Sequence, residues 1–158
     1  MSLAWLAALP ALAAGAEPLA IVVSSRWQGA DAIELRDLRE VYLGRRTRLF
    51  GASVRRIDLA PGSAARAGFS RSVLGRSEQD LERYWIEQAL SGGALPPREV
   101  ATPPDAVAAA EARVGTIAYL PASSLARLDA DGVRILPILV DGVATRPGAP
   151  GYPARTLD

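Results

Sequence analysis

The feature that most constrains the fold is the order in which strand-like and helix-like segments follow one another. Aliphatic or β-branched runs at 19–23, 54–59, 116–120 and 133–140 have the composition of buried strands. Between them lie segments with helical apolar spacing or high alanine content, at 32–43, 64–74, 77–90, 102–113 and 123–128. Such alternation predicts an α/β fold in which a sheet carries helices packed on its faces.

Residues typical of helix ends predict where these helices start and stop. We expect Asp31 to cap the first helix and Ser77 to open the third, because their side-chain oxygens accept bonds from unpaired first-turn amides. Thr102-Pro103-Pro104 starts the fourth, since proline is tolerated in a first turn whose amides have no partner. Gly44 follows the first helix at the place where a left-handed C-terminal residue is expected, and Gly75 closes the second helix. These ends divide the chain into short, compact elements.

Composition excludes several classes of function. All 18 basic residues are arginines and the net charge is only +1, so no basic field favours nucleic acid or an anionic membrane. Cysteine and histidine are absent, which removes disulfides, thiolate nucleophiles and the usual zinc ligands. No phosphate-binding loop, dinucleotide fingerprint or nucleophile elbow occurs. We therefore expect no enzyme activity, no catalytic residue, no metal site and no cofactor.

The N-terminus has the pattern of an export signal. Residues 1–14 are almost wholly apolar, and Ala14-Gly15-Ala16 gives the small-x-small pattern of a cleavage site. Cleavage after Ala16 leaves 17–158 as one domain in the periplasm. The apolar run ends at Glu17, short of the roughly 20 residues that span a bilayer, so no membrane span is expected in the mature chain. An uncleaved anchor remains an alternative, because only the terminal amine is positive there.

The junction between the 54–59 strand and the next helix is the main candidate for ligand binding. A helix N-terminus presents unpaired amides to an anion, and Ser63 can add a hydroxyl while Arg66 lies one turn further on. Ser63 as a plain helix cap is the structural alternative. Ser24 and Ser25, which follow the first strand, are secondary candidates because ligands gather at the carboxyl ends of strands.

Four stretches, in the same order, resemble phosphate ABC transporter substrate-binding proteins. They are the helix and turn at 35–47, the Gly62-Ser63 turn within 59–66, the strand at 114–120, and Gly151-Tyr152-Pro153-Ala154-Arg155. The resemblance implies a type 2 periplasmic binding protein fold, of which this chain holds roughly one lobe, with a mixed sheet flanked by helices.

The resemblance also implies where an oxyanion would bind. The family's turn usually reads Gly-Ser-Gly-Thr, but here Ala64 and Ala65 replace its second glycine and its threonine, so one hydroxyl donor is lost. The expected oxyanion site consists of Gly62, Ser63, Ala64, Ala65 and Arg66, with Ser24 and Ser25.

Two hypotheses for function follow. In the first, the chain binds phosphate or a related oxyanion weakly in the periplasm, in support of transport or sensing. In the second, it is an interaction module of the cell envelope that retains the fold without the ligand. The second implies an envelope protein partner, and a homodimer that builds a shared site would join the two hypotheses.

Overall fold

A computed structural model of the chain describes residues 17–140 and 143–145. The predicted signal peptide at 1–16 and the family-like stretch Gly151-Tyr152-Pro153-Ala154-Arg155 lie outside the described residues. The statements below concern the described part of the chain.

The centre of the fold is a five-stranded mixed sheet with the strand order β6-β5-β7-β1-β8. β5 is parallel to both β6 and β7, whereas β1 runs antiparallel to its neighbours β7 and β8. The strands are β1 (Leu19–Ser24), β5 (Arg55–Leu59), β6 (Arg98–Val100), β7 (Thr116–Pro121) and β8 (Val133–Ile135). The expected α/β class with a mixed sheet is confirmed.

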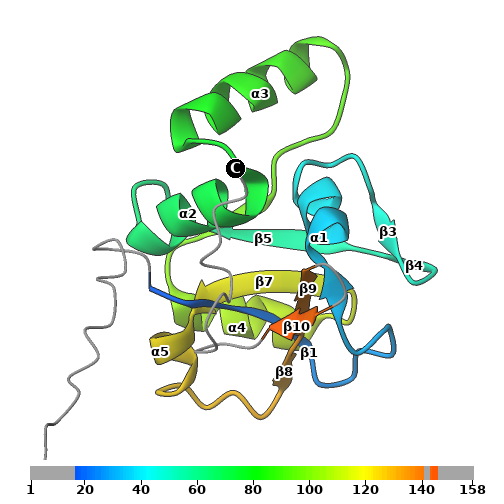
Figure 1. Ribbon diagram of the computed structural model, residues 1–158, viewed down its shortest axis with the longest axis vertical. Coiled ribbons are helices and arrows are strands. Elements are labelled where there is room, and N and C mark those ends of the chain that lie inside the picture. The colour runs from blue at the N-terminus through cyan, green and yellow to red at the C-terminus, as the bar shows by residue number, and fades with distance from the viewer. Residues whose placement is uncertain (1–16, 141–142, 146–158) are drawn as a thin grey trace, which may run out of the picture.

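Helices cover both faces of this sheet because its central strands are apolar on both sides. All six residues of β1 are buried, as a continuous aliphatic run requires. On one face, Tyr119 of β7 stacks on Phe69 of α2 with ring centroids 3.9 Å apart. On the other face lies α4, which packs against β7, β1 and β5 (Figure 1). The core therefore has a helix layer on each side of the sheet.

The helices agree with most of the predicted ends. They are α1 (Leu35–Tyr42), α2 (Ala64–Phe69), which continues as a π-helical turn at Ser70–Leu74, α3 (Glu78–Leu90), α4 (Pro103–Ala112) and α5 (Ala122–Leu125). Ser77 and Thr102 are N-caps whose side chains accept from the amides of Asp80 and Asp105. Gly75 is left-handed with φ 66°. The local capping signals were thus sufficient for these helices.

Two expectations were wrong. Asp31 does not cap the first helix, because a short strand, β2 (Ile33–Glu34), intervenes and Glu34 takes the cap position without a side-chain hydrogen bond. The strand expected at 133–140 is broken at Pro137, which has no N–H for a continuous ladder. Its second half, β9 (Ile138–Val140), instead joins a separate sheet with β2 and β10 (Val143–Thr145).

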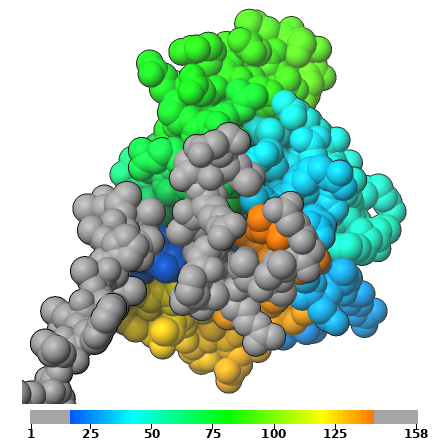
Figure 2. All heavy atoms as spheres, in the orientation of Figure 1, coloured from blue at the N-terminus to red at the C-terminus, as the bar shows by residue number. Residues whose placement is uncertain are grey.

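Two parts of the chain project from this body. A hairpin of β3 (Arg48–Leu49) and β4 (Ala52–Ser53) extends at one side, and α3 stands beyond α2 at the end of the molecule (Figure 1, Figure 2). Leu81 and Tyr84 anchor α3 to the core, and the Tyr84 hydroxyl donates to the Leu43 carbonyl at 2.7 Å. Within the described ranges, no helix has the length and apolarity that crossing a bilayer requires.

Candidate functional site

The turn between β5 and α2 has the form that the sequence predicted. Gly62 adopts φ +79°, a left-handed conformation that glycine accepts readily, and the chain then enters α2 at Ser63. Ser63 is the N-cap, and its Oγ accepts from the Arg66 amide at 3.2 Å. Its own amide donates to the Ala60 carbonyl at 3.2 Å. Ser63 Oγ is therefore the acceptor of the helix cap, and its O–H is still a donor.

A carboxylate of the chain itself occupies the turn. Glu78, in the first turn of α3, accepts a hydrogen bond from the Gly62 amide through Oε2, with 3.1 Å between the two atoms. An incoming oxyanion would use the same backbone donor. Glu78 thus takes the place that an external anion would need at Gly62.

Arg66 is likewise paired within the chain. Its Nη1 lies 2.6 Å from Oε1 of Glu99 on β6, and its Nε lies 3.5 Å from Asp58 and 3.8 Å from Glu78. The same Nη1 donates to the Leu59 carbonyl at 2.9 Å. Burial lowers the pKa of Arg66, but the hydrogen bond to Glu99 and the charge of Asp58 outweigh it, and the net pKa is raised. Arg66 and its three carboxylate partners are called the Arg66 cluster below.

Asp58 ties this cluster to the core. Its carboxylate accepts a short hydrogen bond from the Tyr119 hydroxyl, which in turn accepts from the Leu59 amide at 3.3 Å. Burial raises the pKa of Asp58, and the Tyr119 hydrogen bond and the positive charge of Arg66 offset only part of the rise. Burial, together with the charge of Asp58, also raises the pKa of Tyr119. The Tyr119 hydroxyl is therefore neutral and serves Asp58 as a hydrogen-bond donor.

The fold separates the predicted site residues into two groups. Gly62, Ser63, Ala64, Ala65 and Arg66 are contiguous at the carboxyl end of β5 and the first turn of α2. Because β1 is antiparallel to β7, Ser24 and Ser25 fall at the opposite end of the sheet, beside the start of β7. Ser24 is buried and its Oγ accepts from the Arg26 amide, while the Ser25 amide donates to the Gly132 carbonyl.

Sequence reasoning missed Glu78 and Glu99. Glu78 lies 16 positions from Gly62, and Glu99 lies 33 positions from Arg66 on a short edge strand. No local pattern marks either residue as a partner of the turn. Only the packing of α3 and β6 around β5 brings these carboxylates to Arg66.

Several solved structures that resemble this chain are described as proteins of phosphate transport. An ABC-type phosphate transport receptor from Vibrio cholerae matches 77% of this chain at 14% identity, with a TM-score of 0.59. A putative phosphate ABC transporter substrate-binding protein from Clostridium perfringens, solved with bound phosphate, matches 80% at 16% identity and a TM-score of 0.60. PstS from Borrelia burgdorferi matches 77% at 12% identity and a TM-score of 0.58.

These matches cover 46%, 46% and 47% of the respective solved chains, so this chain spans about half the length of the proteins it resembles. No protein-family model and no curated protein sequence matches the chain. Sequence and structure together give this chain the fold of phosphate ABC transporter substrate-binding proteins, at about half of their length.

Proposed function

We propose that this chain is an exported interaction module of the cell envelope, which keeps the fold of a phosphate-binding protein and does not capture free phosphate. The observation that carries the proposal is the Glu78 carboxylate on the Gly62 amide, beside an Arg66 that is paired with Asp58 and Glu99. The chain's own acids thus pair with two of the groups that would hold an oxyanion, the Gly62 amide and the Arg66 guanidinium.

Electrostatics at the turn also oppose an anion. The Arg66 cluster holds three carboxylates and one guanidinium, a balance of −2, or −1 with Asp58 protonated. Two like charges 4 Å apart near a protein surface repel by about 4 kcal/mol at an effective dielectric constant of 20. Phosphate would have to displace Glu78 and then remain beside the other carboxylates. The net field at the turn therefore disfavours its binding.

The surface of α3 supports a role in protein contact. Ile86 and Leu90 on this helix are 55% and 84% exposed, and Leu95 in the following loop is 74% exposed. Single exposed apolar residues are ordinary, but a group of large ones on a projecting element is typical of interaction surfaces. We expect an envelope protein to be the partner that binds this surface. The alternative partner is a second copy of this chain.

The proposal is tested by thermal unfolding of residues 17–158 in millimolar phosphate, sulfate and molybdate against chloride, at constant ionic strength. A ligand present at 100 times its dissociation constant stabilises the native state by about 2.7 kcal/mol, a shift of several degrees. We expect no anion to differ from chloride. A selective, saturating shift with phosphate contradicts the proposal.

A second measurement tests the contact surface. A photo-crosslinking amino acid at Leu90 should give discrete adducts in envelope preparations. The control position is Arg127, which is also exposed but lies just after α5 and not on α3, and it should give none. Adducts of the same pattern from both positions, or from neither, would contradict a specific contact through α3. An adduct of twice the chain's mass identifies a homodimer.

A further inference from the structure

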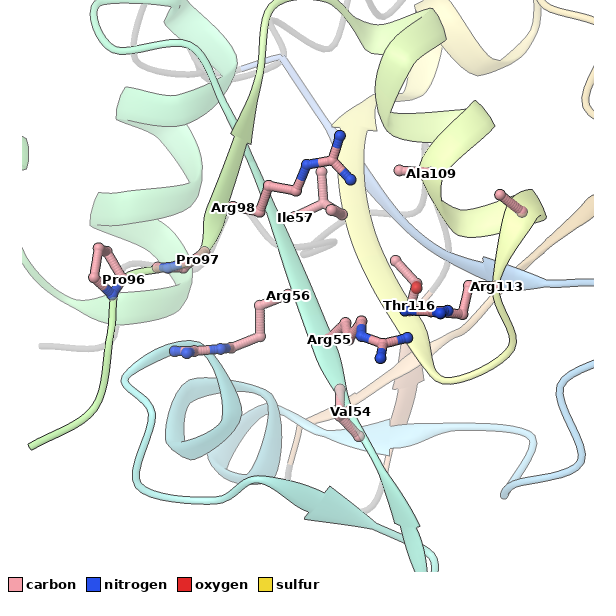
Figure 3. Close-up of a pocket in the computed structure, with 11 residues that line it drawn as sticks. Val54, Arg55, Arg56, Ile57, Pro96, Pro97, Arg98, Ala109, Arg113 and Thr116 are labelled. Atoms are coloured by element: carbon pink, nitrogen blue, oxygen red, sulfur yellow. The ribbon is translucent and has the colours of Figure 1, made fainter.

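A groove lies at the opposite end of the parallel strands from Ser63. It is bordered by β5 and β6 on one side and by the end of α4 on the other, and its volume is about 450 Å³ (Figure 3). Its floor is apolar, with Ile57, Pro97 and Ala109 among the lining side chains. It is therefore distinct from the Arg66 cluster, and the function proposed above does not use it.

Arginines define the chemistry of this groove. Arg55, Arg56, Arg98 and Arg113 line it, and no acidic residue does. Arg56 points away from the other three in Figure 3. Its guanidinium donates to the Tyr42 and Leu95 carbonyls at 3.1 and 2.8 Å. The other three are exposed, and none of them forms a salt bridge with any residue in the described ranges.

The three remaining arginines come from different elements but line the same groove. Figure 3 shows Arg55 of β5 and Arg113 from the end of α4 extending toward one another beside Thr116. Arg98 of β6 extends toward α4 above Ile57. Like charges brought together without a carboxylate between them repel one another, and a bound anion would relieve that repulsion.

The strand register sets the spacing of these charges. Arg55 pairs with Thr116, and Arg98 pairs with Ile57, two residues further along β5. Because side chains alternate along a strand, Arg55 and Ile57 share one face, and Arg98 beside Ile57 shares it too. Arg55 and Arg98 are therefore offset by about 7 Å along the strands. Along the strand direction this offset matches the spacing of alternate residues in an extended peptide, and the neighbouring strands add about 4.8 Å across it.

We propose that the groove binds an extended acidic segment of a partner protein, with carboxylates on alternate residues facing Arg55 and Arg98. This inference rests on the function proposed above and names the chemistry of the partner. Guanidinium forks bind carboxylates bidentately, and the apolar floor accommodates the stems of the acidic side chains. β6 is an edge strand of its sheet, beside which extended segments commonly bind.

Two other anionic partners fit the groove less well. Single-stranded nucleic acid is commonly bound through aromatic side chains that stack on its bases, and the groove lining contains none. A single phosphate would contact the guanidinium groups alone and leave the apolar floor of the groove uncovered. The alternating acidic segment satisfies both the charge and the spacing.

The test is fluorescence anisotropy of residues 17–158 with a labelled heptapeptide of alternating serine and glutamate. One control peptide replaces glutamate by glutamine, and another has the same composition with its glutamates contiguous. We expect saturable binding of the alternating peptide, at least about fivefold weaker binding of the contiguous one, and none of the glutamine peptide. Equal binding of the two acidic peptides, or no binding of either, overturns the proposal.

Matched variants locate the binding. Arg55→Gln with Arg98→Gln should weaken binding at least about tenfold, since two charge-assisted contacts are lost. Arg71→Gln with Arg127→Gln removes the same charge from exposed arginines outside the groove and should change binding less than about twofold. Unchanged thermal unfolding confirms that both variants fold. Equal losses in both variants would show general charge attraction and overturn the assignment.

The peptide assay and the anion unfolding assay test the two proposals separately. Complete displacement of the peptide by equimolar citrate would identify a small-anion site and overturn the peptide assignment. Absence of peptide binding leaves the interaction module intact, with its partner at another surface. Saturable phosphate binding in the unfolding assay contradicts the module itself, whatever the peptide does.

Discussion

Replacement of Arg66 by methionine tests whether this residue supports the fold. The Arg66 and Asp58 side chains are only 15% and 12% exposed, and their charged atoms lie 3.5 Å apart. Met fills much of the same volume without the charge. The substitution therefore leaves the Asp58 carboxylate buried without a cation.

The expected loss follows from the burial of this pair. Removal of one partner of a buried ion pair destabilises a protein by about 3–5 kcal/mol, because the remaining charge stays desolvated. Glu99 is half exposed, so the loss of its ion pair with Arg66 adds little to the destabilisation. Since Asp58 keeps its Tyr119 hydrogen bond, we expect Arg66→Met to lower the free energy of unfolding by about 3 kcal/mol, at the lower end of that range. For a chain of this size, each kcal/mol corresponds to about 2–4 °C in Tm.

The loss should depend on pH in a defined direction. The pKa of folded Asp58 is already raised by burial, so its contribution to stability falls as pH rises from its unfolded pKa through its folded one. Arg66→Met removes one influence that lowers this pKa, which raises it further. The variant should therefore be most destabilised at neutral pH and should approach the wild type as Asp58 is protonated on acidification.

Urea unfolding followed by circular dichroism measures these differences. Arg71→Met is the control, because Arg71 is exposed and forms no ion pair within the described residues; it should change the free energy of unfolding by less than about 0.5 kcal/mol. Asp58→Asn combined with Arg66→Met should lose less than the sum of the two single changes. A loss below about 0.5 kcal/mol in Arg66→Met would refute the structural role of the pair.

Three further substitutions are measured by the same unfolding assay. Ser63→Ala removes the cap on the Arg66 amide and should cost about 1 kcal/mol; an unchanged midpoint would mean that the cap is dispensable. Tyr119→Phe leaves the buried Asp58 without its hydroxyl donor and should cost about 1–3 kcal/mol, and a neutral result would contradict that hydrogen bond. Gly115→Ala should destabilise by at least about 1 kcal/mol, because Gly115 has φ +90° and a Cβ there would lie 2.7 Å from the Ser53 carbonyl oxygen; tolerance of alanine would exclude this close approach.

Features that depend on neighbouring residues could be predicted from the sequence. The Ser77 start and the left-handed Gly44, which has φ 74°, were predicted because each involves only the first or last turn of its helix. The Gly62-Ser63 turn was predicted for the same reason. The general class of the fold followed from the alternation of strands and helices.

Features that depend on distant pairing could not be predicted. The antiparallel direction of β1 moves Ser24 and Ser25 to the far end of the sheet, and an aliphatic run does not reveal its direction. The second sheet joins two-residue β2 to β9 across more than 100 positions. Glu78 and Glu99 reach the turn only through tertiary packing. The site therefore differs from the expected one in its charge, because these two carboxylates make it negative.

The central claim is that the chain's own carboxylates occupy the turn between β5 and α2. The most direct test is calorimetric titration of phosphate into the wild-type chain and into the Glu78→Gln, Glu99→Gln variant. Removal of two carboxylates lowers the repulsion of an anion and leaves Asp58 as the one acidic partner of Arg66 among the described residues. We expect no measurable binding to the wild type and saturable, salt-sensitive binding to the variant, with a gain of at least about tenfold. Phosphate binding to the wild type that is as tight as binding to the variant would contradict the claim that the chain's own carboxylates fill this site.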